Sequence, residues 1–154
     1  MIMNPNAIVT LADSNYFELL DELINSIKAH EESKNVSICV LDAGLTKEQS
    51  EILKKKVYSV KKAEWDIKVP VYKVLKKEWL KSQVSRAFLP NYFPEFKKYL
   101  WIDCDAWVNS WETIELYFEA CNNGKLGITQ TIGPGYRILT RVHWVFNKLA
   151  LIKS

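Results

Sequence analysis

The chain has 154 residues, of which 48% are hydrophobic, 25% are charged and 12% are aromatic, with five Gly and five Pro. This composition excludes collagen-like, low-complexity and disordered chains, and the length allows one domain spanning residues 1–154. The net charge of +3 is too small to indicate a nucleic-acid-binding surface, so no nucleic-acid partner is expected.

The hydrophobic pattern in the first half of the chain alternates between the periods of strands and helices. A β-branched run at residues 7–11 predicts a strand, and apolar residues at helical spacing over residues 16–27 predict a helix after it. Residues 36–41 predict a second strand, and a capping box at Thr46 and Gln49 predicts the start of a second helix. The apolar side of this helix is expected to comprise Ile52, Leu53, Val57 and Val60.

The middle of the chain predicts two further strands with a helix between them. Residues 69–75 predict the third strand, and residues 78–93 predict a helix that Pro90 and Pro94 interrupt. The continuous apolar run at residues 99–102 is typical of a strand that is buried on both faces of a sheet.

The last part of the chain predicts helices around a short fifth strand. A capping box at Asn109 and Glu112 predicts a helix that ends near Gly124, followed by a strand at residues 126–129 and a helix at residues 137–152. Strands that alternate with helices indicate an α/β fold, a mainly parallel sheet flanked by helices on both faces.

The cysteines and the hydropathy of the chain indicate its cellular location. Cys39, Cys104 and Cys121 are widely spaced and form no Cys-x-x-Cys pair, so neither a zinc knuckle nor a disulfide framework is expected. Free thiols in apolar surroundings are typical of the reducing cytoplasm. The first ten residues do not resemble a signal peptide, and no apolar run approaches the roughly 20 residues that span a bilayer. We therefore expect a cytoplasmic protein.

Two carboxylates follow the strand predicted at residues 99–102, where parallel sheets bind their ligands. In an extended segment, residues i and i+2 point to the same side, so Asp103 and Asp105 would converge. A divalent cation relieves the repulsion between them, and oxygen ligands suit Mg²⁺ or Mn²⁺. The residues therefore predict a metal site at Asp103 and Asp105, although Asp is also common in loops without such a role.

Three other features are candidates for ligand contact. The turn after the first predicted strand would present Asp13 as a hydrogen-bond acceptor and Tyr16 as a flat face for a base, unless they are only a helix cap and a core Tyr. Arg86 can bind a phosphate or brace the carboxylates, unless it is an ordinary surface Arg. Five lysines between residues 54 and 62 predict the exposed face of a helix, with peripheral membrane contact as the alternative.

Taken in order, these segments resemble the GT-A-fold glycosyltransferases, most closely the retaining enzymes of family eight, which are glycogenin-like or bacterial galactosyltransferase-like. The matching pieces are Ile8-Val9-Thr10 through Asp13-Ser14-Asn15-Tyr16, then Ile38-Cys39-Val40-Leu41-Asp42, Ser85-Arg86-Ala87-Phe88-Leu89-Pro90 and Lys98-Tyr99-Leu100-Trp101-Ile102-Asp103-Cys104-Asp105. The resemblance covers roughly residues 7–130. It implies a Rossmann-like fold. It also implies an enzyme that transfers a sugar from a nucleotide sugar, such as a UDP-sugar, to a glycan, lipid or protein acceptor.

The resemblance also implies roles for individual residues. Asp103 and Asp105 would bind Mn²⁺ or Mg²⁺ across the diphosphate, with Cys104 between them, and the metal would neutralise the leaving group as a Lewis acid. Catalytic roles fall to Arg86 and Asp105. The resemblance implies that Arg86 stands near the diphosphate and donor sugar. The full set of residues implied to contact the donor is Thr10, Ala12, Asp13, Tyr16, Arg86, Asp103 and Cys104.

Departures from the family leave two alternatives open. Family members are longer, and no segment here matches the His, the Lys and the acceptor pocket of their C-terminal half. We therefore expect a truncated catalytic domain, either a transferase or a non-catalytic nucleotide-sugar-binding unit that needs a partner. A truncated sheet would expose apolar surface and favour a homo-oligomer. A haloacid-dehalogenase-like phosphatase is a weaker alternative, because Trp107 stands where that motif has Thr or Val.

Overall fold

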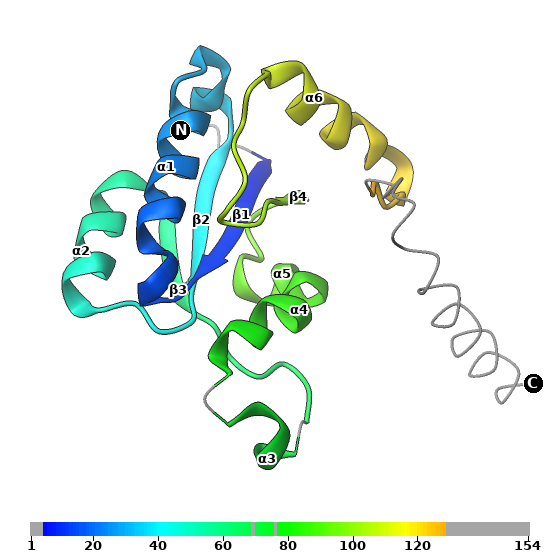
Figure 1. Cartoon of the computed structure of the whole chain (residues 1–154). Helices are drawn as coiled ribbons and strands as arrows, with labels where there is room; N and C mark the ends of the chain where they lie inside the picture. Colours follow the sequence, from blue (N-terminus) through cyan, green and yellow to red (C-terminus); the bar gives the residue numbers. More distant parts are fainter. Residues whose placement is uncertain (1–4, 69, 76, 129–154) are drawn as a thin grey trace, which may run out of the picture.

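The described residues form a sheet of four parallel strands, in the order β3-β2-β1-β4 (Figure 1). The computed structural model describes residues 5–68, 70–75 and 77–128. The strands are β1 (Asn6–Ala12), β2 (Ser37–Asp42), β3 (Ser59–Lys62) and β4 (Lys98–Trp101). Ile8 of β1 is aligned with Ile38 of β2 on one side and with Leu100 of β4 on the other. The expected α/β fold with a parallel sheet is confirmed.

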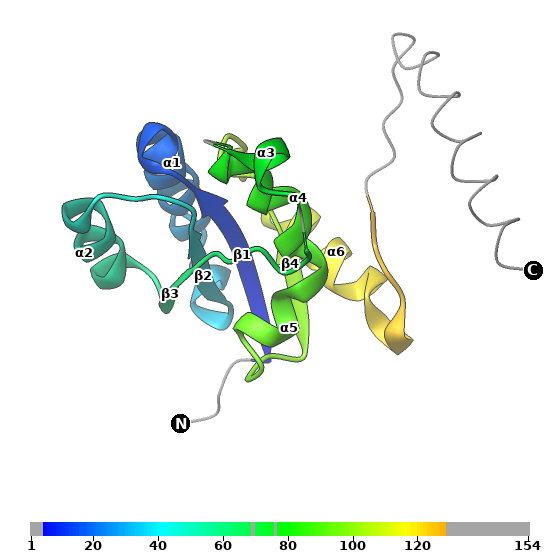
Figure 2. The same ribbon diagram turned by 90° about the horizontal axis from the view of Figure 1, so that it is seen from below.

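Helices cover both faces of the sheet, because both faces of its central strands are apolar (Figure 2). The longer helices are α1 (Phe17–Lys28), α2 (Lys47–Lys56) and α6 (Trp111–Ala120). These three helices pack on one face, against a cluster that includes Ile8 and Val40. On the other face, Leu89 of α5 (Leu89–Tyr92) and the following Phe93 pack against Val9. The alternation of Ile8 and Val9 between the two clusters is the period of two that a strand imposes.

Local capping signals were predicted correctly in the first half of the chain. The Thr46 hydroxyl accepts from the Gln49 N–H at 3.2 Å, and the Gln49 amide oxygen accepts from the Thr46 N–H at 2.9 Å. The apolar side of α2 was predicted less well. Leu53 is buried, but Ile52 is exposed, Val57 ends the helix and Val60 belongs to β3.

The prediction for residues 69–75 was wrong. In that range the structure has a short helix, α3 (Val71–Val74), and the third strand is β3 instead. β3 was missed because it is a short edge strand, half-buried or exposed, which shows no apolar run. The helix predicted at residues 78–93 is broken into α4 (Lys81–Ser85), α5 and two 3-10 segments (Glu78–Leu80 and Arg86–Phe88). Pro90 lies in the first turn of α5, where its missing N–H is tolerated.

Three expectations for the region after residue 97 also need correction. Both faces of β4 pack against the core, Leu100 on one cluster and Tyr99 and Trp101 on the other, but the strand is only half-buried, because within the described residues it is the edge strand of the sheet. α6 begins after Ser110 with no side-chain cap, so the predicted capping box is absent. Leu126 and Ile128 are highly exposed and form no strand. The loop predicted at 133–135 and the helix at 137–152 lie outside the described residues, and among the described helices none could cross a membrane.

Candidate functional site

The neighbouring strands β1 and β4 bring two of the predicted site segments to the same edge of the sheet. Backbone pairing continues past the end of β4, since the Ile102 N–H donates to the Val9 carbonyl at 3.1 Å. The chain therefore leaves the sheet at Asp103 close to where β1 gives way to the loop that begins at Asp13. This is the carboxyl edge of a parallel sheet, at which ligands of such folds bind.

Asp103, Cys104 and Asp105 form a tight turn, not the extended segment expected from the sequence. The Ala106 N–H closes the turn by donating to the Asp103 carbonyl at 3.0 Å. The side chains therefore alternate between the faces of the sheet as far as Asp103 and no further. The prediction that Asp103 and Asp105 point to the same side because the segment is extended was wrong in its reason. Both Asp residues are exposed, so both carboxylates are open to a ligand from solvent.

The Cys104 side chain packs in the core cluster beside α1 and α6. Burial, followed by the negative charges of Asp105, Asp103 and Asp13, raises the pKa of this thiol from 9.0 to about 11. The thiol is therefore protonated at neutral pH.

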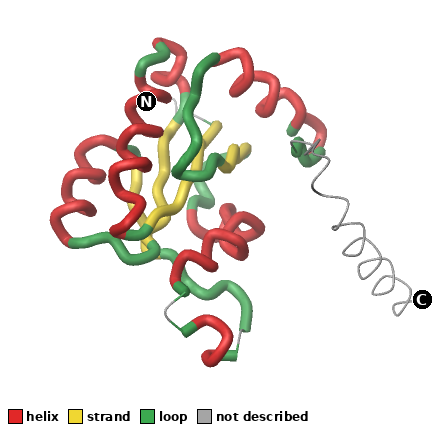
Figure 3. The backbone as a smooth tube through the Cα atoms, in the orientation of Figure 1, coloured by secondary structure: helices red, strands yellow, loops and turns green. Residues whose placement is uncertain are grey.

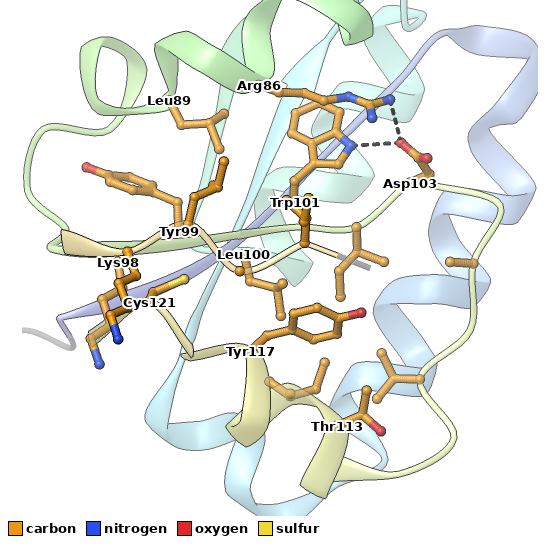
Figure 4. A pocket seen from close by; sticks show the side chains of 18 of the residues that line it. Arg86, Leu89, Lys98, Tyr99, Leu100, Trp101, Asp103, Thr113, Tyr117 and Cys121 are labelled. Atoms are coloured by element: carbon orange, nitrogen blue, oxygen red, sulfur yellow. Dashed lines mark hydrogen bonds and ion pairs between the residues drawn. The ribbon is translucent and has the colours of Figure 1, made fainter. Parts of the chain in front are cut away.

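Arg86 and Trp101 both bind one oxygen of Asp103 (Figure 4). Nη2 of Arg86 lies 3.0 Å from Oδ1, and the indole Nε1 of Trp101 donates to the same atom at 2.7 Å. The guanidinium also lies over the indole ring, 5.2 Å from its centroid, and its Nε donates to the Ser82 carbonyl at 2.9 Å. The brace that the sequence suggested between Arg86 and a carboxylate is therefore present at Asp103.

The loop that follows the turn runs from the end of β4 to α6 (green in Figure 3) and contacts α1 at the buried residue Val108. The Val108 N–H donates to the buried Ser26 hydroxyl at 3.1 Å, and the Val108 carbonyl lies 3.3 Å from Nε2 of His30. The His30 ring also packs on Trp111 at the start of α6. Asp103 and Asp105 are thus held between two attachments, the pairing of β4 with β1 and the contacts at Val108.

A groove of about 1130 Å³ runs along β4, and Asp103 and Asp105 are among the residues that line it. Its walls come from β4, from the helical segment that contains Arg86, from α6 and from residues 124–128. Figure 4 shows the side of the groove formed by Leu100, Tyr117 and Thr113. The two carboxylates therefore border a cavity that is large enough for a small organic ligand.

The loop after β1 presents two of its four predicted contact residues. Oδ1 of Asp13 accepts from the N–H groups of Asn15 (2.9 Å) and Tyr16 (3.3 Å), and the Tyr16 side chain is 46% exposed. Tyr16 is therefore not the core residue of the plainer interpretation. Thr10 and Ala12 are buried in the sheet, and the Thr10 hydroxyl has no hydrogen-bond partner among the described residues. Their side chains do not reach the surface where a nucleotide would bind.

Trp101 is a site residue that sequence analysis did not single out. It was interpreted only as part of an apolar strand, and its indole in fact contacts both Arg86 and Asp103. One signal was present in the sequence. Trp101 precedes Asp103 by two residues, so the two side chains share a face as long as the chain stays extended.

The exposed carboxylate oxygens at the turn are suitable ligands for a divalent cation that also binds a phosphate group. In the described part of the chain, no three His, Cys, Asp or Glu side chains gather closely enough to hold a metal alone. Mg²⁺ in nucleotide sites is usually bound by one or two carboxylates, with substrate phosphates and water as the other ligands. Asp103 and Asp105 supply two such carboxylates, exposed at the border of a groove.

The five lysines between residues 54 and 62 were expected to lie on one helix, and this expectation was wrong. Lys61 and Lys62 belong to β3, and only Lys54, Lys55 and Lys56 lie on α2. Lys54 pairs with Glu51 at 2.7 Å, and Lys56 pairs with Asp21 at 2.6 Å. Lys61 donates to the Tyr92 carbonyl and lies over the Phe93 ring. Several of these charges are therefore engaged within the protein, and contact with anionic lipid stays an untested prediction.

Comparison with known proteins gives one clear match. The family model described as glycosyl transferase family 8 matches residues 7–131, which include β1, the Asp103–Asp105 turn and α6. A search of curated proteins finds no match for the chain.

Proposed function

Because the chain belongs to glycosyl transferase family 8, a family of glycosyltransferases that use nucleotide-sugar donors, we propose that its sheet edge binds a UDP-sugar together with Mn²⁺ or Mg²⁺. The observation that carries the proposal is the turn at Asp103 and Asp105, exposed at the carboxyl edge of the sheet and bordering a groove. The reaction is transfer of the sugar to a glycan, lipid or protein acceptor.

Asp103 and Asp105 would hold the cation against the diphosphate of the donor. When bound, this ion supplies a Lewis acid that neutralises the charge of the departing nucleoside diphosphate. Arg86 adds a positive charge beside Asp103, and a guanidinium matches the geometry of phosphate oxygens. Its Nε bond to the Ser82 carbonyl holds the side chain near that position before a donor arrives.

The loop after β1 would bind the nucleoside. Tyr16 offers an exposed ring for stacking on a base, and Asp13 has a second carboxylate oxygen beyond the one that caps Asn15 and Tyr16. The Ser14 N–H and carbonyl are bound by the Gly44 carbonyl (3.1 Å) and the Gln49 amide (3.2 Å), so the loop is held against the start of α2. The buried Thr10 and Ala12 would contribute indirectly, by fixing the end of β1 from which the loop at Asp13 starts.

A second candidate function is nucleotide-sugar binding without turnover. Such a binding unit would use the same exposed carboxylates, Asp103 and Asp105, and the same exposed Tyr16 as the transferase. Release of free sugar from UDP-glucose or UDP-galactose distinguishes the two functions. Binding of UDP with Mn²⁺ and no sugar release supports the binding unit, and sugar release that depends on Mn²⁺ supports the transferase.

Calorimetric titration of UDP, with and without Mn²⁺, tests the site itself. We expect Mn²⁺ to strengthen UDP binding, and the double variant Asp103→Ala/Asp105→Ala to weaken the Mn²⁺-dependent affinity by about tenfold or more, which corresponds to about 1.4 kcal/mol or more. The control is Glu31→Ala/Glu32→Ala, which removes two exposed negative charges elsewhere on the protein. Equal affinity in the two double variants would show that the carboxylates have been assigned to the wrong site.

We also propose that the chain forms a homo-oligomer through the groove along β4. Exposed Trp107, Leu126 and Ile128 line the groove along β4, and a second chain that covered them would remove apolar surface from water. Size-exclusion chromatography of the whole chain checks this, and elution as a monomer at high protein concentration would contradict it.

A further inference from the structure

We propose that Trp101 is a positioning residue for the cation site, whose indole N–H and ring hold Asp103 and Arg86 so that Oδ2 of Asp103 stays available to a divalent cation. The inference rests on the proposed function, because it assumes that Asp103 binds a metal. It adds a residue that contacts neither the metal nor the donor and acts through its two neighbours.

Oδ1 of Asp103 receives two strong donors. The indole N–H lies 2.7 Å away, at the short end of the range for a hydrogen bond to a charged group, and the Arg86 guanidinium lies 3.0 Å away. A carboxylate oxygen has about two lone-pair directions, so these contacts use the acceptor capacity of Oδ1. Oδ2 makes no hydrogen bond or ion pair to the described residues, and the Asp103 side chain is 55% exposed. A cation therefore finds one oxygen engaged and the other open.

Arg86 is a competitor for the same carboxylate unless something restrains it. A guanidinium prefers to bind both oxygens of a carboxylate through two parallel N–H groups, and that arrangement would occupy Oδ2 as well. In the structure the Nε of Arg86 is instead used by the Ser82 carbonyl, and only Nη2 reaches Asp103. The Trp101 ring lies under the guanidinium at 5.2 Å and favours this orientation through a cation–π interaction. Trp101 thus restrains both members of the ion pair.

The indole can do this because its own position is set by the sheet. Trp101 is the last residue of β4, and its Cα is aligned with Val9 of the central strand β1. Its side chain packs against the core cluster that contains Val9 and Phe93. A ring that is held by the core and carries one N–H donor presents that donor in a nearly fixed direction, so little conformational entropy is lost when Asp103 is positioned.

The variant Trp101→Phe tests the inference, because it removes the N–H and keeps an aromatic ring, though a smaller one, under Arg86. We measure Mn²⁺ affinity in the whole chain by electron paramagnetic resonance of free Mn²⁺, with UDP present. Residues that hydrogen-bond a metal ligand typically contribute tenfold or more to affinity, so we expect the variant to bind Mn²⁺ about tenfold more weakly. The control Trp79→Phe changes an exposed Trp on a 3-10 segment and should leave the affinity unchanged.

A second measurement leaves Trp101 in place. In the unaltered chain labelled with ¹⁵N-tryptophan, one indole N–H signal should shift when Mg²⁺ and UDP are added, and Asp103→Asn should move the same signal without ligand. This reports the hydrogen bond itself, even where Trp101→Phe fails to fold.

Three results would overturn the inference, and they distinguish its failure from failure of the proposed function. If the unaltered protein binds Mn²⁺ and Trp101→Phe binds it equally well, Trp101 has no positioning role and the proposed function stands. The same conclusion follows if no indole signal responds to Asp103→Asn. If the unaltered protein binds no Mn²⁺ with UDP, the proposed function fails and this inference fails with it.

Discussion

Replacement of Ser26 by Ala should loosen the loop that carries the two site carboxylates. Ser26 lies in α1 and is 3% exposed, and its hydroxyl donates to the Leu23 carbonyl at 2.8 Å while it accepts from the Val108 N–H at 3.1 Å. Val108 is also buried, so the variant leaves a backbone N–H in the interior without its acceptor. This is the type of loss that costs the full desolvation of the polar group.

The size of the effect follows from two opposing contributions. An unsatisfied buried donor costs about 1–3 kcal/mol, whereas Ala in place of Ser within a helix recovers about 0.5 kcal/mol. We therefore expect the free energy of unfolding to fall by about 0.5–2.5 kcal/mol, which lowers the melting temperature of a domain of this size by about 2–8 °C. Urea unfolding measures the first quantity. Hydrogen exchange at the Val108 amide should also become faster in the variant.

The matched control is Ser33→Ala. Ser33 is half-buried, and its hydroxyl makes no hydrogen bond to the described residues, so its replacement should change the free energy of unfolding by less than about 0.5 kcal/mol. If Ser26→Ala and Ser33→Ala unfold at the same urea concentration, the contact between Ser26 and Val108 does not hold the loop. The reasoning about the second attachment of the site would then be refuted.

Two more predictions concern groups outside the proposed ligand contacts. Lys98 donates to the Phe118 carbonyl (3.1 Å) and to Asn122 (2.7 Å) at the end of α6, so Lys98→Met should lower the free energy of unfolding by about 0.5–1.5 kcal/mol in urea titrations, and Lys97→Met should not. Since burial raises the pKa of Cys104 from 9.0 to about 11, the unfolded thiol ionises first as pH rises, and stability should fall between about pH 9 and pH 11. That fall should be shallower in Cys104→Ala, as measured by urea midpoints across this range, and a slope equal to that of the unaltered protein would contradict the assigned burial.

The success of the sequence predictions varied with how local their signals were. β1 and β2 are continuous apolar runs at the centre of the sheet, and the capping box at Thr46 and Gln49 involves residues three apart, so a short window contains all the information. β3 has the sequence Ser-Val-Lys-Lys, which carries no strand pattern of its own. It is a strand because β2 offers it a partner, and the exposed edge accepts lysines.

The candidate site shows the same division. The position of Asp103 and Asp105 directly after an apolar run was sufficient to mark them as ligand candidates. Their geometry could not be predicted, because the turn at Ala106 replaces the extended backbone that the prediction assumed. The sequence suggested that Arg86 could brace a carboxylate, but it could not predict that the guanidinium would also lie over Trp101, since that depends on how a broken helix packs against the end of β4.

The sequence alone determined the α/β class, the parallel sheet and the residues that supply carboxylates at its edge, because hydrophobic period and capping act over a few neighbouring residues. Only the tertiary structure decided that β4 is the edge strand of the described sheet, that Thr10 is buried and Tyr16 exposed, and that a Trp and an Arg share one oxygen of Asp103. The physical reason is that these features arise from contacts between segments that are distant in the chain, and each such contact depends on where the other segments have already packed.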